Sequence, residues 1–498
     1  MKRSTRRSLK KYRAATVFVA VFSILALVSF LAFIYFHDQQ AVVTKKSTQK
    51  FEFTEYYVPI VHFTDIKNNI SMEDLKKILI GDDKSYRLYL ASEDEASVAN
   101  MLGLSDGEKI QYIESSTKEI VNQIAEKPGG FSLAPVLSVD YRVKSLSVDG
   151  KNVWDKKQSD YPLSYKAVTT DKRVADNSFN KSNITLLTNV GDVILGRHVA
   201  YKMRTYNDYN HPWLKMADIV KRGDITFADL ETPLSDVASP PDEGMNFIAP
   251  KKAISGLLLA GIDIVALANN HSTNFGVKAF TDTLDILTKS NIKYVGGGVN
   301  SAEAYQSTKM QVNGLRITFL NYNSIVGATN ATTSSPGVAK FAIKPWTEID
   351  DRDDIEKIKN NIKEAKKNSD LVVVEFHWGV EYTPNPIQSQ INVAHAAIDS
   401  GADLVVGTHP HVVQAFESYK NVPIFYSLGN FIFDQEWSTE TKQGVVAETY
   451  FYKKRLVSIK AIPYQIEDYN QPTTANPTQH KQIMNRIYNA SLSSEFKQ

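Results

Sequence analysis

The sequence predicts an α/β fold in which a mostly parallel sheet is covered by helices. Between residues 184 and 465, short apolar runs alternate with segments of helical spacing. Five of these runs have the composition of buried parallel strands, and a polar motif directly follows each one. They are Ile184–Val190, Ile225–Phe227, Asp263–Ala268, Leu371–Phe376 and Leu404–Val406. The carboxyl ends of such strands meet in one crevice, where open α/β sheets bind ligands.

A hydrophobic stretch near the N-terminus predicts a membrane helix. Ala14–Phe36 has no charged residue, and its 23 residues are enough to cross a hydrocarbon core of about 30 Å. Seven lysines and arginines crowd residues 1–13, which predicts a cytoplasmic N-terminus and an extracellular main body. A cleaved signal peptide is the alternative, but its apolar core would span only about 7–15 residues. We therefore expect a single-pass signal anchor in the cell membrane.

The rest of the chain is too long for one hydrophobic core, so we expect at least two folded regions. The prediction is a polar stalk, a smaller α/β domain, a polar linker, a larger α/β domain and a polar C-terminal tail. Their boundaries are 37–50, 51–165, 166–183, 184–465 and 466–498. In the smaller domain, Tyr56–Phe63 and Tyr86–Ala91 have the composition of strands, and Met72–Ile80 and Ser116–Ala125 have helical spacing.

Helices and one hairpin are predicted in the larger domain. The helical segments are Lys251–Ala260, Lys278–Ser290, Asp353–Lys367 and Pro386–Ser400. Two lysines join Gly444–Tyr452 to Arg455–Ile462, which predicts an antiparallel hairpin. The tail that follows is polar and predicts a short helix at most.

The composition excludes several classes of function. The chain contains no cysteine, so a disulfide scaffold and thiolate metal ligands are both excluded. Its net charge of +2 gives no indication of a nucleic-acid partner.

The polar motifs at the strand ends contain the residue types of a divalent metal site. They are Gly191-Asp192, Leu230-Glu231, Asn269-Asn270-His271, His377-Trp378-Gly379-Val380-Glu381 and Thr408-His409-Pro410-His411. Carboxylate, amide and imidazole ligands suit a hard or borderline divalent cation. Such a cation polarises a phosphoryl oxygen and lowers the pKa of water, so the motifs also suggest a type of reaction.

Several of these residues also have a purely structural interpretation. Asp192 could cap the following helix, and Glu231 could be an exposed carboxylate in a turn. His377 could be a hydrogen-bonded core histidine, with Glu381 four residues later placed to orient its ring or accept a proton. The two histidines of His409-Pro410-His411 could lie exposed in a loop. In an extended segment, however, their i, i+2 spacing points them the same way and allows them to chelate one cation.

Together the motifs resemble the CapA family of capsule and poly-γ-glutamate synthesis proteins, which is similar to the calcineurin-like metallophosphoesterases. The resemblance covers about residues 184–440. It rests on seven motifs in order: GDVILGR, LETP, MNFIAP, LANNHSTNFG, HWGVEY, GTHPHVVQ and YSLGNFIFDQ. It implies a metallophosphatase-like α/β/β/α sandwich that binds one or two Mn²⁺, Zn²⁺ or Fe²⁺ ions. It also implies a role in making or exporting an anionic cell-surface polymer.

The resemblance assigns metal ligands position by position. They are Asp192, Glu231, Asn270, His377, His409 and His411. One departure concerns the histidine that usually stands two residues after the first aspartate, because Ile194 occupies that position here. One metal position therefore loses a ligand, and a single ion is the alternative to a dinuclear site. The stretch GGFSLAPVLSVDYRVKSLSVDG, before residue 165, resembles part of a periplasmic solute-binding lobe, and an independent docking module is its alternative.

Two classes of function follow from these observations. One is a metal-dependent hydrolase or transferase that acts outside the membrane on a phosphoester or a γ-glutamyl polymer. Either His271 or the neighbouring pair of His377 and Glu381 would supply its acid–base chemistry. The other is a non-catalytic component that binds the polymer and guides it outwards. A phosphoesterase unrelated to capsule is a further alternative. The expected partners are the cell membrane, an anionic polymer such as poly-γ-glutamate and other membrane subunits of capsule synthesis.

Overall fold

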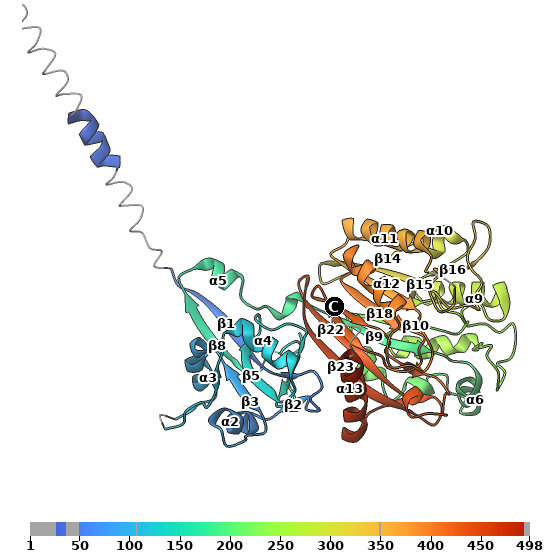
Figure 1. Ribbon diagram of the computed structural model, residues 1–498, viewed down its shortest axis with the longest axis horizontal. Helices are drawn as coiled ribbons and strands as arrows, with labels where there is room; N and C mark the ends of the chain where they lie inside the picture. Colours follow the sequence, from blue (N-terminus) through green and yellow to red (C-terminus); the bar gives the residue numbers. More distant parts are fainter. Residues whose placement is uncertain (1–25, 36–48, 106, 159, 348–349, 493–498) are drawn as a thin grey trace, which may run out of the picture. The chain divides into compact units, whose positions relative to one another are not determined.

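The computed structural model describes residues 26–35, 49–105, 107–158, 160–347 and 350–492 (Figure 1). Within the predicted membrane helix Ala14–Phe36, residues 26–35 are helical and exposed, and the remainder lies outside the described residues. Among the residues that are described, no helix combines the length and the apolar composition needed to cross a membrane. The described chain forms two compact units. One combines parts of residues 1–55 with 165–178, and the other contains 56–164 and 179–498.

The first unit contains the start of β1 (Phe51–His62), which pairs with β8 (Ser164–Thr169). The hydroxyl of Tyr165 donates to the carboxylate of Glu55. Helix α5 (Lys172–Asp176) follows β8. The predicted linker before residue 184 therefore contains a strand and a helix of its own.

Residues 56–164 of the second unit form a mixed sheet of order β4-β3-β5-β1-β6. Besides β1, its strands are β3 (Arg87–Leu90), β4 (Ile113–Glu114), β5 (Gly130–Pro135) and β6 (Val143–Ser145), and β2 (Asn69–Ile70) pairs with β7 (Ser147–Val148). The helices are α2 (Met72–Ile80), α3 (Glu95–Met101) and α4 (Thr117–Glu126). Helix α2 has the predicted bounds. Ser71 caps its start by accepting from the amide of Asp74, and Gly81, at φ 82°, ends it.

Two larger sheets make up most of the second unit. The first has the order β12-β11-β10-β9-β22-β23-β24, with β21 also paired to β9, and the second has the order β14-β15-β17-β18-β20-β19. The first contains β9 (Ile184–Val193), β10 (Ile225–Leu230), β11 (Ile264–Ala266), β12 (Lys293–Val295), β21 (Asn430–Ile432), β22 (Gln443–Tyr452), β23 (Arg455–Glu467) and β24 (Gln471–Thr474). The second contains β14 (Thr308–Val312), β15 (Leu315–Asn323), β17 (Leu371–His377), β18 (Leu404–Thr408), β19 (Phe416–Tyr419) and β20 (Val422–Phe425). Their central strands are parallel, and the predicted antiparallel hairpin is β22–β23.

The two sheets pack face to face through an apolar layer. Phe227 on β10 and Val373 on β17 belong to this layer, whereas their neighbours Ala228 and Val374 pack under the helices. Because successive residues of a strand alternate between faces, both faces of these strands are buried. That is why the strands form continuous apolar runs in the sequence. The arrangement is an α/β sandwich.

Helices cover the outer faces of these sheets. They are α6 (Arg197–Thr205), α7 (Ala217–Val220), α8 (Ile254–Leu259), α9 (Gly276–Lys289), α10 (Ser301–Ala304), α11 (Arg352–Lys367) and α12 (Gln388–Asp399), whereas α13 (Pro477–Ser491) packs against the layer between the sheets. The four helices predicted for the larger domain correspond to α8, α9, α11 and α12. Asp351 caps α11 by accepting from two backbone amides, and Ile358 and Ile362 form its buried face as the spacing predicts.

The C-terminal segment differs from the predicted polar tail with a short helix at most. Helix α13 extends over 15 residues and buries Ile483, Met484 and Ile487 in the layer between the sheets. Asn476 caps the helix and accepts from two backbone amides. The polar residues between them face outwards. The segment is therefore polar on average although its apolar residues form one regular face of the helix.

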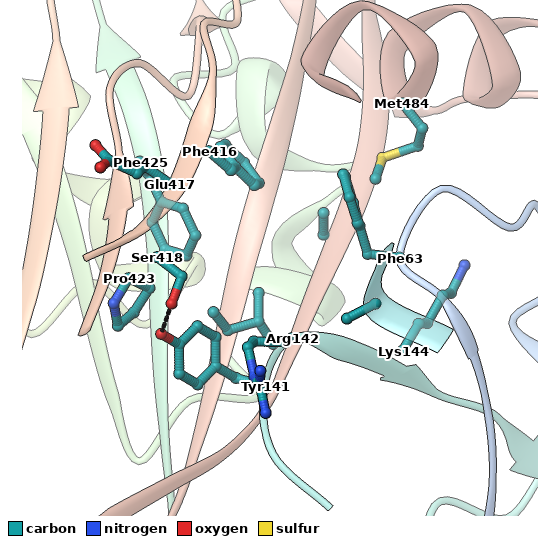
Figure 2. A pocket seen from close by; sticks show the side chains of 13 residues that line it. Phe63, Tyr141, Arg142, Lys144, Phe416, Glu417, Ser418, Pro423, Phe425 and Met484 are labelled. Carbon is teal, nitrogen blue, oxygen red and sulfur yellow. Dashed lines mark hydrogen bonds between the residues drawn. The ribbon is translucent and has the colours of Figure 1, made fainter. Parts of the chain in front are cut away.

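A cavity of about 250 Å³ lies between the smaller sheet and the C-terminal part of the same unit (Figure 2). Its walls are mainly aromatic and aliphatic, and Phe416 lies across from Phe63 and Met484. At its edge, the hydroxyl of Tyr141 lies 2.6 Å from that of Ser418. None of the candidate metal ligands lines this cavity.

Candidate metal centre

On each central strand, the side chains that face the layer between the two sheets are apolar along most of the strand and polar at its carboxyl end. On β10, Phe227 is followed on the same face by Asp229 and then by Glu231, one residue past the strand. On β17 the same row ends in Glu375 and His377. All four polar residues are buried. The strand ends therefore place titratable side chains between the two sheets.

Asp192 is a fully buried residue near the end of β9. Its Oδ1 accepts from the amide of His409 at 3.1 Å, and its Oδ2 lies 3.0 Å from Nδ1 of His411. The residue before helix α6 is Gly196, so the interpretation of Asp192 as a helix cap is wrong. The preceding Gly191 lies so close to the next segment that an added Cβ would stand 1.9 Å from the carbonyl oxygen of Gly429.

Glu231 is fully buried, which excludes an exposed turn carboxylate. Its Oε1 lies 3.6 Å from Nε2 of His377 and 3.8 Å from Nε2 of His271. Neither carboxylate oxygen has a hydrogen-bond partner. An unsatisfied buried carboxylate is costly, so both oxygens have the environment of metal ligands rather than of structural groups.

In the motif Asn269-Asn270-His271 after β11, the first residue is structural and the next two face the site. Asn269 is structural, because its amide nitrogen donates to Asp229 at 2.8 Å and its oxygen accepts from Ser272. Asn270 presents Oδ1 at 2.7 Å from Nε2 of His377. His271 lies with Nδ1 2.9 Å from Oδ1 of Asn274, which also accepts from a backbone amide. Nδ1 of His271 is therefore the donor, and its Nε2 faces Glu231 with a free lone pair.

Asp229 is a residue of the site that the sequence analysis did not identify. Its Oδ2 lies 2.9 Å from Nδ1 of His377, and the hydroxyl of Thr408 lies 3.0 Å from the same nitrogen. With Nδ1 donating to Asp229, Nε2 of His377 and Oδ1 of Asn270 are two acceptors that face one another. Two converging acceptors are expected where both bind one cation. The i, i+2 spacing of Asp229 and Glu231 in ADLE was the available signal.

His409 and His411 both lie at the centre, and both are buried. Their φ values are 91° and 58°, so the segment is not extended as predicted but turns sharply on either side of Pro410. Neither ring nitrogen of His409 has a hydrogen-bond partner. Nδ1 of His411 contacts Oδ2 of Asp192 and, at 2.8 Å, Oδ1 of Asn430. The exposed-loop interpretation of both histidines is wrong.

Glu381 lies at the rim of the site, with 32% of its side chain exposed. Its Oε1 is 3.9 Å from Nε2 of His411. The sequence analysis placed it beside His377, but both nitrogens of that ring have other partners. Glu381 can therefore exchange protons with solvent and faces His411 rather than His377.

Burial controls the protonation of the centre. It raises the pKa of Asp229 to about 7 and the pKa of Glu231 well above the usual range, and neighbouring carboxylates add to the effect on Glu231. It lowers the pKa of His271 and of His377 to about 3. Burial alone would also lower the pKa of His411, but the hydrogen bond and charge of Asp192 raise it. The centre thus combines the neutral imidazoles of His271 and His377 with buried carboxylates, and the charge of Asp192 favours the protonated form of His411.

The arrangement fits a divalent cation. Two groups of buried ligand atoms converge, each within 4.8 Å, and Glu231 belongs to both. One group is Glu231, His409 and His411, and the other is Asp192, Asp229, Glu231 and His377. Carboxylate and imidazole ligands of this kind can bind a metal ion, and the positive charge would offset the repulsion among the carboxylates.

An apolar cluster fills the position of the missing histidine. Ile194 packs with Phe247 and Phe433, and all three are buried. The rings of His271 and His411 contact Phe247 and Phe433 at centroid distances of 4.4 and 5.4 Å. The side of the centre next to Ile194 is therefore hydrophobic and supplies no ligand.

A family model described as "Bacterial capsule synthesis protein PGA_cap" matches residues 186–435. The chain belongs to this family. The match contains every candidate metal ligand from Asp192 to His411. The resemblance that the seven motifs indicated is thereby confirmed.

Named relatives agree with this assignment. The "Capsule biosynthesis protein CapA" of Bacillus anthracis is 32% identical over 327 residues, which cover 64% of this chain and 76% of the relative. The "PGA biosynthesis protein CapA" of Bacillus subtilis (strain 168) is 31% identical over 283 residues, or 56% and 71% of the two chains. A "Probable polyglutamine synthesis accessory protein" of Mycobacterium tuberculosis is 26% identical over 260 residues, or 49% and 66%. This PGA_cap chain is thus similar to proteins named for capsule, PGA or polyglutamine synthesis.

Proposed function

We propose that this PGA_cap protein acts outside the cell membrane in the synthesis or export of an anionic polymer such as poly-γ-glutamate, through a divalent metal centre. The family match and the names of the relatives support the process. The proposal includes the signal anchor Ala14–Phe36, whose length suits a membrane and whose basic flank suits the cytoplasm. Other membrane subunits of capsule synthesis are the proposed partners.

The observation that carries the proposal is the set of buried polar atoms without partners. Both oxygens of Glu231 and both ring nitrogens of His409 are buried and form no hydrogen bond. A fold that only needed stability would satisfy or replace them. Asp192, Asn270, His377 and His411 surround these atoms, and a mixed oxygen and nitrogen ligand set suits Mn²⁺, Zn²⁺ or Fe²⁺.

The chain's own residues have distinct proposed roles around the cation. A bound cation would polarise an oxygen of the substrate and lower the pKa of water. Asp229 orients His377, and Asn274 orients His271 so that its free nitrogen faces the reacting groups. His271 is therefore placed to accept a proton, and the partly exposed Glu381 is placed to pass one to solvent.

Metal binding tests the site directly. The purified chain should retain a transition metal after dialysis, and the double variant His409→Ala/His411→Ala should retain none, because it removes two of the converging nitrogens and the contact to Asp192. His395→Ala is the control, since His395 bonds to Glu417 on the far side of the sheet. Elemental analysis gives the stoichiometry. Equal metal content in the double variant and the wild type would remove the site as described.

Turnover separates an enzyme from a binding component. Glu381→Gln should keep the metal content and lower the hydrolysis of a phosphodiester or γ-glutamyl substrate by a factor of roughly 10²–10⁴, the usual contribution of general acid–base assistance. Steady-state rates of both proteins at equal metal loading measure this effect. An unchanged rate would exclude Glu381 from proton transfer.

One observation favours the non-catalytic alternative. The apolar cluster around Ile194 leaves one side of the centre without a ligand, so the chain lacks part of a two-metal hydrolytic site. A wild-type protein that is folded, fully metallated and inert towards both substrate classes would establish a polymer-binding role instead.

A further inference from the structure

A polar groove of about 720 Å³ lies along helix α13. One wall is the outer face of helix α13, and the other is formed by residues 384–385 and 439–440. Glu381 precedes the first part of this wall by three residues in the chain. Gln435, whose side chain donates to the hydroxyl of Tyr382, precedes the second part by four. Both parts of this wall are therefore joined through short stretches of chain to residues at the rim of the metal centre.

Unpaired amides dominate the lining of the groove. Gln482, Asn485 and Asn489 are exposed along one face of α13, and Asn385 is exposed on the opposite wall. Across the described residues, none of these four side chains forms a hydrogen bond within the protein. Each side-chain amide offers two hydrogen-bond donors and one acceptor oxygen. The groove can therefore bind a ligand whose groups both donate and accept hydrogen bonds.

The groove carries no net charge. Arg486 is its one cationic residue, and its Nη2 lies 3.2 Å from Oε1 of Glu440, the one anionic residue of the lining. A polyanion bound here would lose hydration without gaining a cationic partner. An uncharged chain with hydroxyl and amide groups avoids this cost.

An exposed indole belongs to the same loop as one wall of the groove. Trp437 is 61% exposed, and it precedes Thr439 of the groove wall by two residues. Its centroid is 5.9 Å from that of Tyr382, which in turn is 6.2 Å from that of His411. A large aromatic ring left exposed beside polar groups offers a flat apolar platform with hydrogen-bonding groups at its edge.

We propose that the groove binds a neutral oligosaccharide. The C–H face of one sugar ring stacks on Trp437, and the amides of α13 exchange hydrogen bonds with the hydroxyl and acetamido groups of the following units. The proposal does not depend on the metal or on polymer synthesis, because none of the groove residues is a candidate metal ligand.

Calorimetric titration of the purified full-length chain with tetramers and hexamers of N-acetylglucosamine tests the proposal. Saturable binding is expected, with tighter binding of the hexamer. The double variant Asn485→Ala/Asn489→Ala should weaken binding about tenfold, because it removes two or more hydrogen bonds. Trp437→Ala should weaken it independently. Asn360→Ala, which removes an exposed amide on α11, is the matched control and should bind as wild type does.

Two results would overturn the proposal. The first is the absence of sugar binding to wild type, or equal binding by the wild type and the groove variants, with folding verified by thermal unfolding. The second is binding of a γ-linked glutamate oligomer that the groove variants weaken while the sugars do not bind, which would assign the groove to the anionic polymer. The titrations are repeated with metal-free protein. Sugar binding that is unchanged there is independent of the metal centre.

Discussion

Asp229 shows how one buried carboxylate organises the centre. It accepts from Asn269 and contacts the ring of His377, so it joins the loop after β11 to the end of β17. Burial raises its pKa to about 7, above the ordinary value of 3.8. A carboxyl group whose pKa is raised on folding stabilises the protein at pH values below the unfolded pKa. That contribution is lost as the pH rises through the folded pKa.

The pH dependence of stability should therefore change when Asp229 is replaced. In metal-free protein, we expect the stability of the wild type relative to Asp229→Asn to fall by on the order of 3 kcal/mol between about pH 4 and pH 8. Chemical denaturation in the presence of a chelator, at several pH values, measures this difference. A difference that stays constant with pH would show that the carboxyl group titrates normally.

At the scale of elements, the convergence of the motifs at the strand ends was predictable from the sequence, but the division of the strands between two sheets was not. The apolar runs before Asp192, Asn270 and His377 have the composition of strands buried on both faces, so the convergence of the motifs follows from parallel pairing. The residues alone did not reveal that β9 and β17 belong to different sheets. That division depends on long-range pairing, which no local pattern encodes, and it entered the prediction only through the family resemblance.

Local composition also explains why Asp229 and the turns at His409 and His411 were not predicted. The predicted strand Ile225–Phe227 ends before Asp229, because an acidic residue interrupts the apolar run, although the strand continues to Leu230. Tertiary burial at the site outweighs the low strand propensity of aspartate. The sharp turns at His409 and His411 have the same kind of origin, since the backbone adopts conformations that only the surrounding contacts stabilise.

Helix α13 should contribute substantially to stability despite its polar composition. Ile487 is fully buried in the layer between the sheets, so Ile487→Ala should lower the free energy of unfolding by about 2–4 kcal/mol. Lys481→Ala, at an exposed position of the same helix, is the control and should change it by less than about 0.5 kcal/mol. Urea denaturation measures both. Equal stability of the two variants would mean that α13 is not docked in solution.

At the scale of the whole molecule, the hydrophobic stretch Ala14–Phe36 is the proposed attachment to the membrane. Deletion of residues 1–37 should release a soluble and folded protein, because the body has the composition of a globular protein. Sedimentation of cell fractions after a high-salt wash, with the full-length chain as control, measures the release. A truncated protein that still sediments with membranes would require a different or second attachment.

The candidate ligands come from both large sheets, with Asp192 and Glu231 on one and His377 and His409 on the other. A cation held between them would cross-link two layers that otherwise adhere through apolar contact. Without it, carboxylates repel one another at that open end of the sandwich. The supply of metal would then set the rigidity of the domain as well as its chemistry, and a scarcity of metal would weaken the protein's resistance to proteolysis.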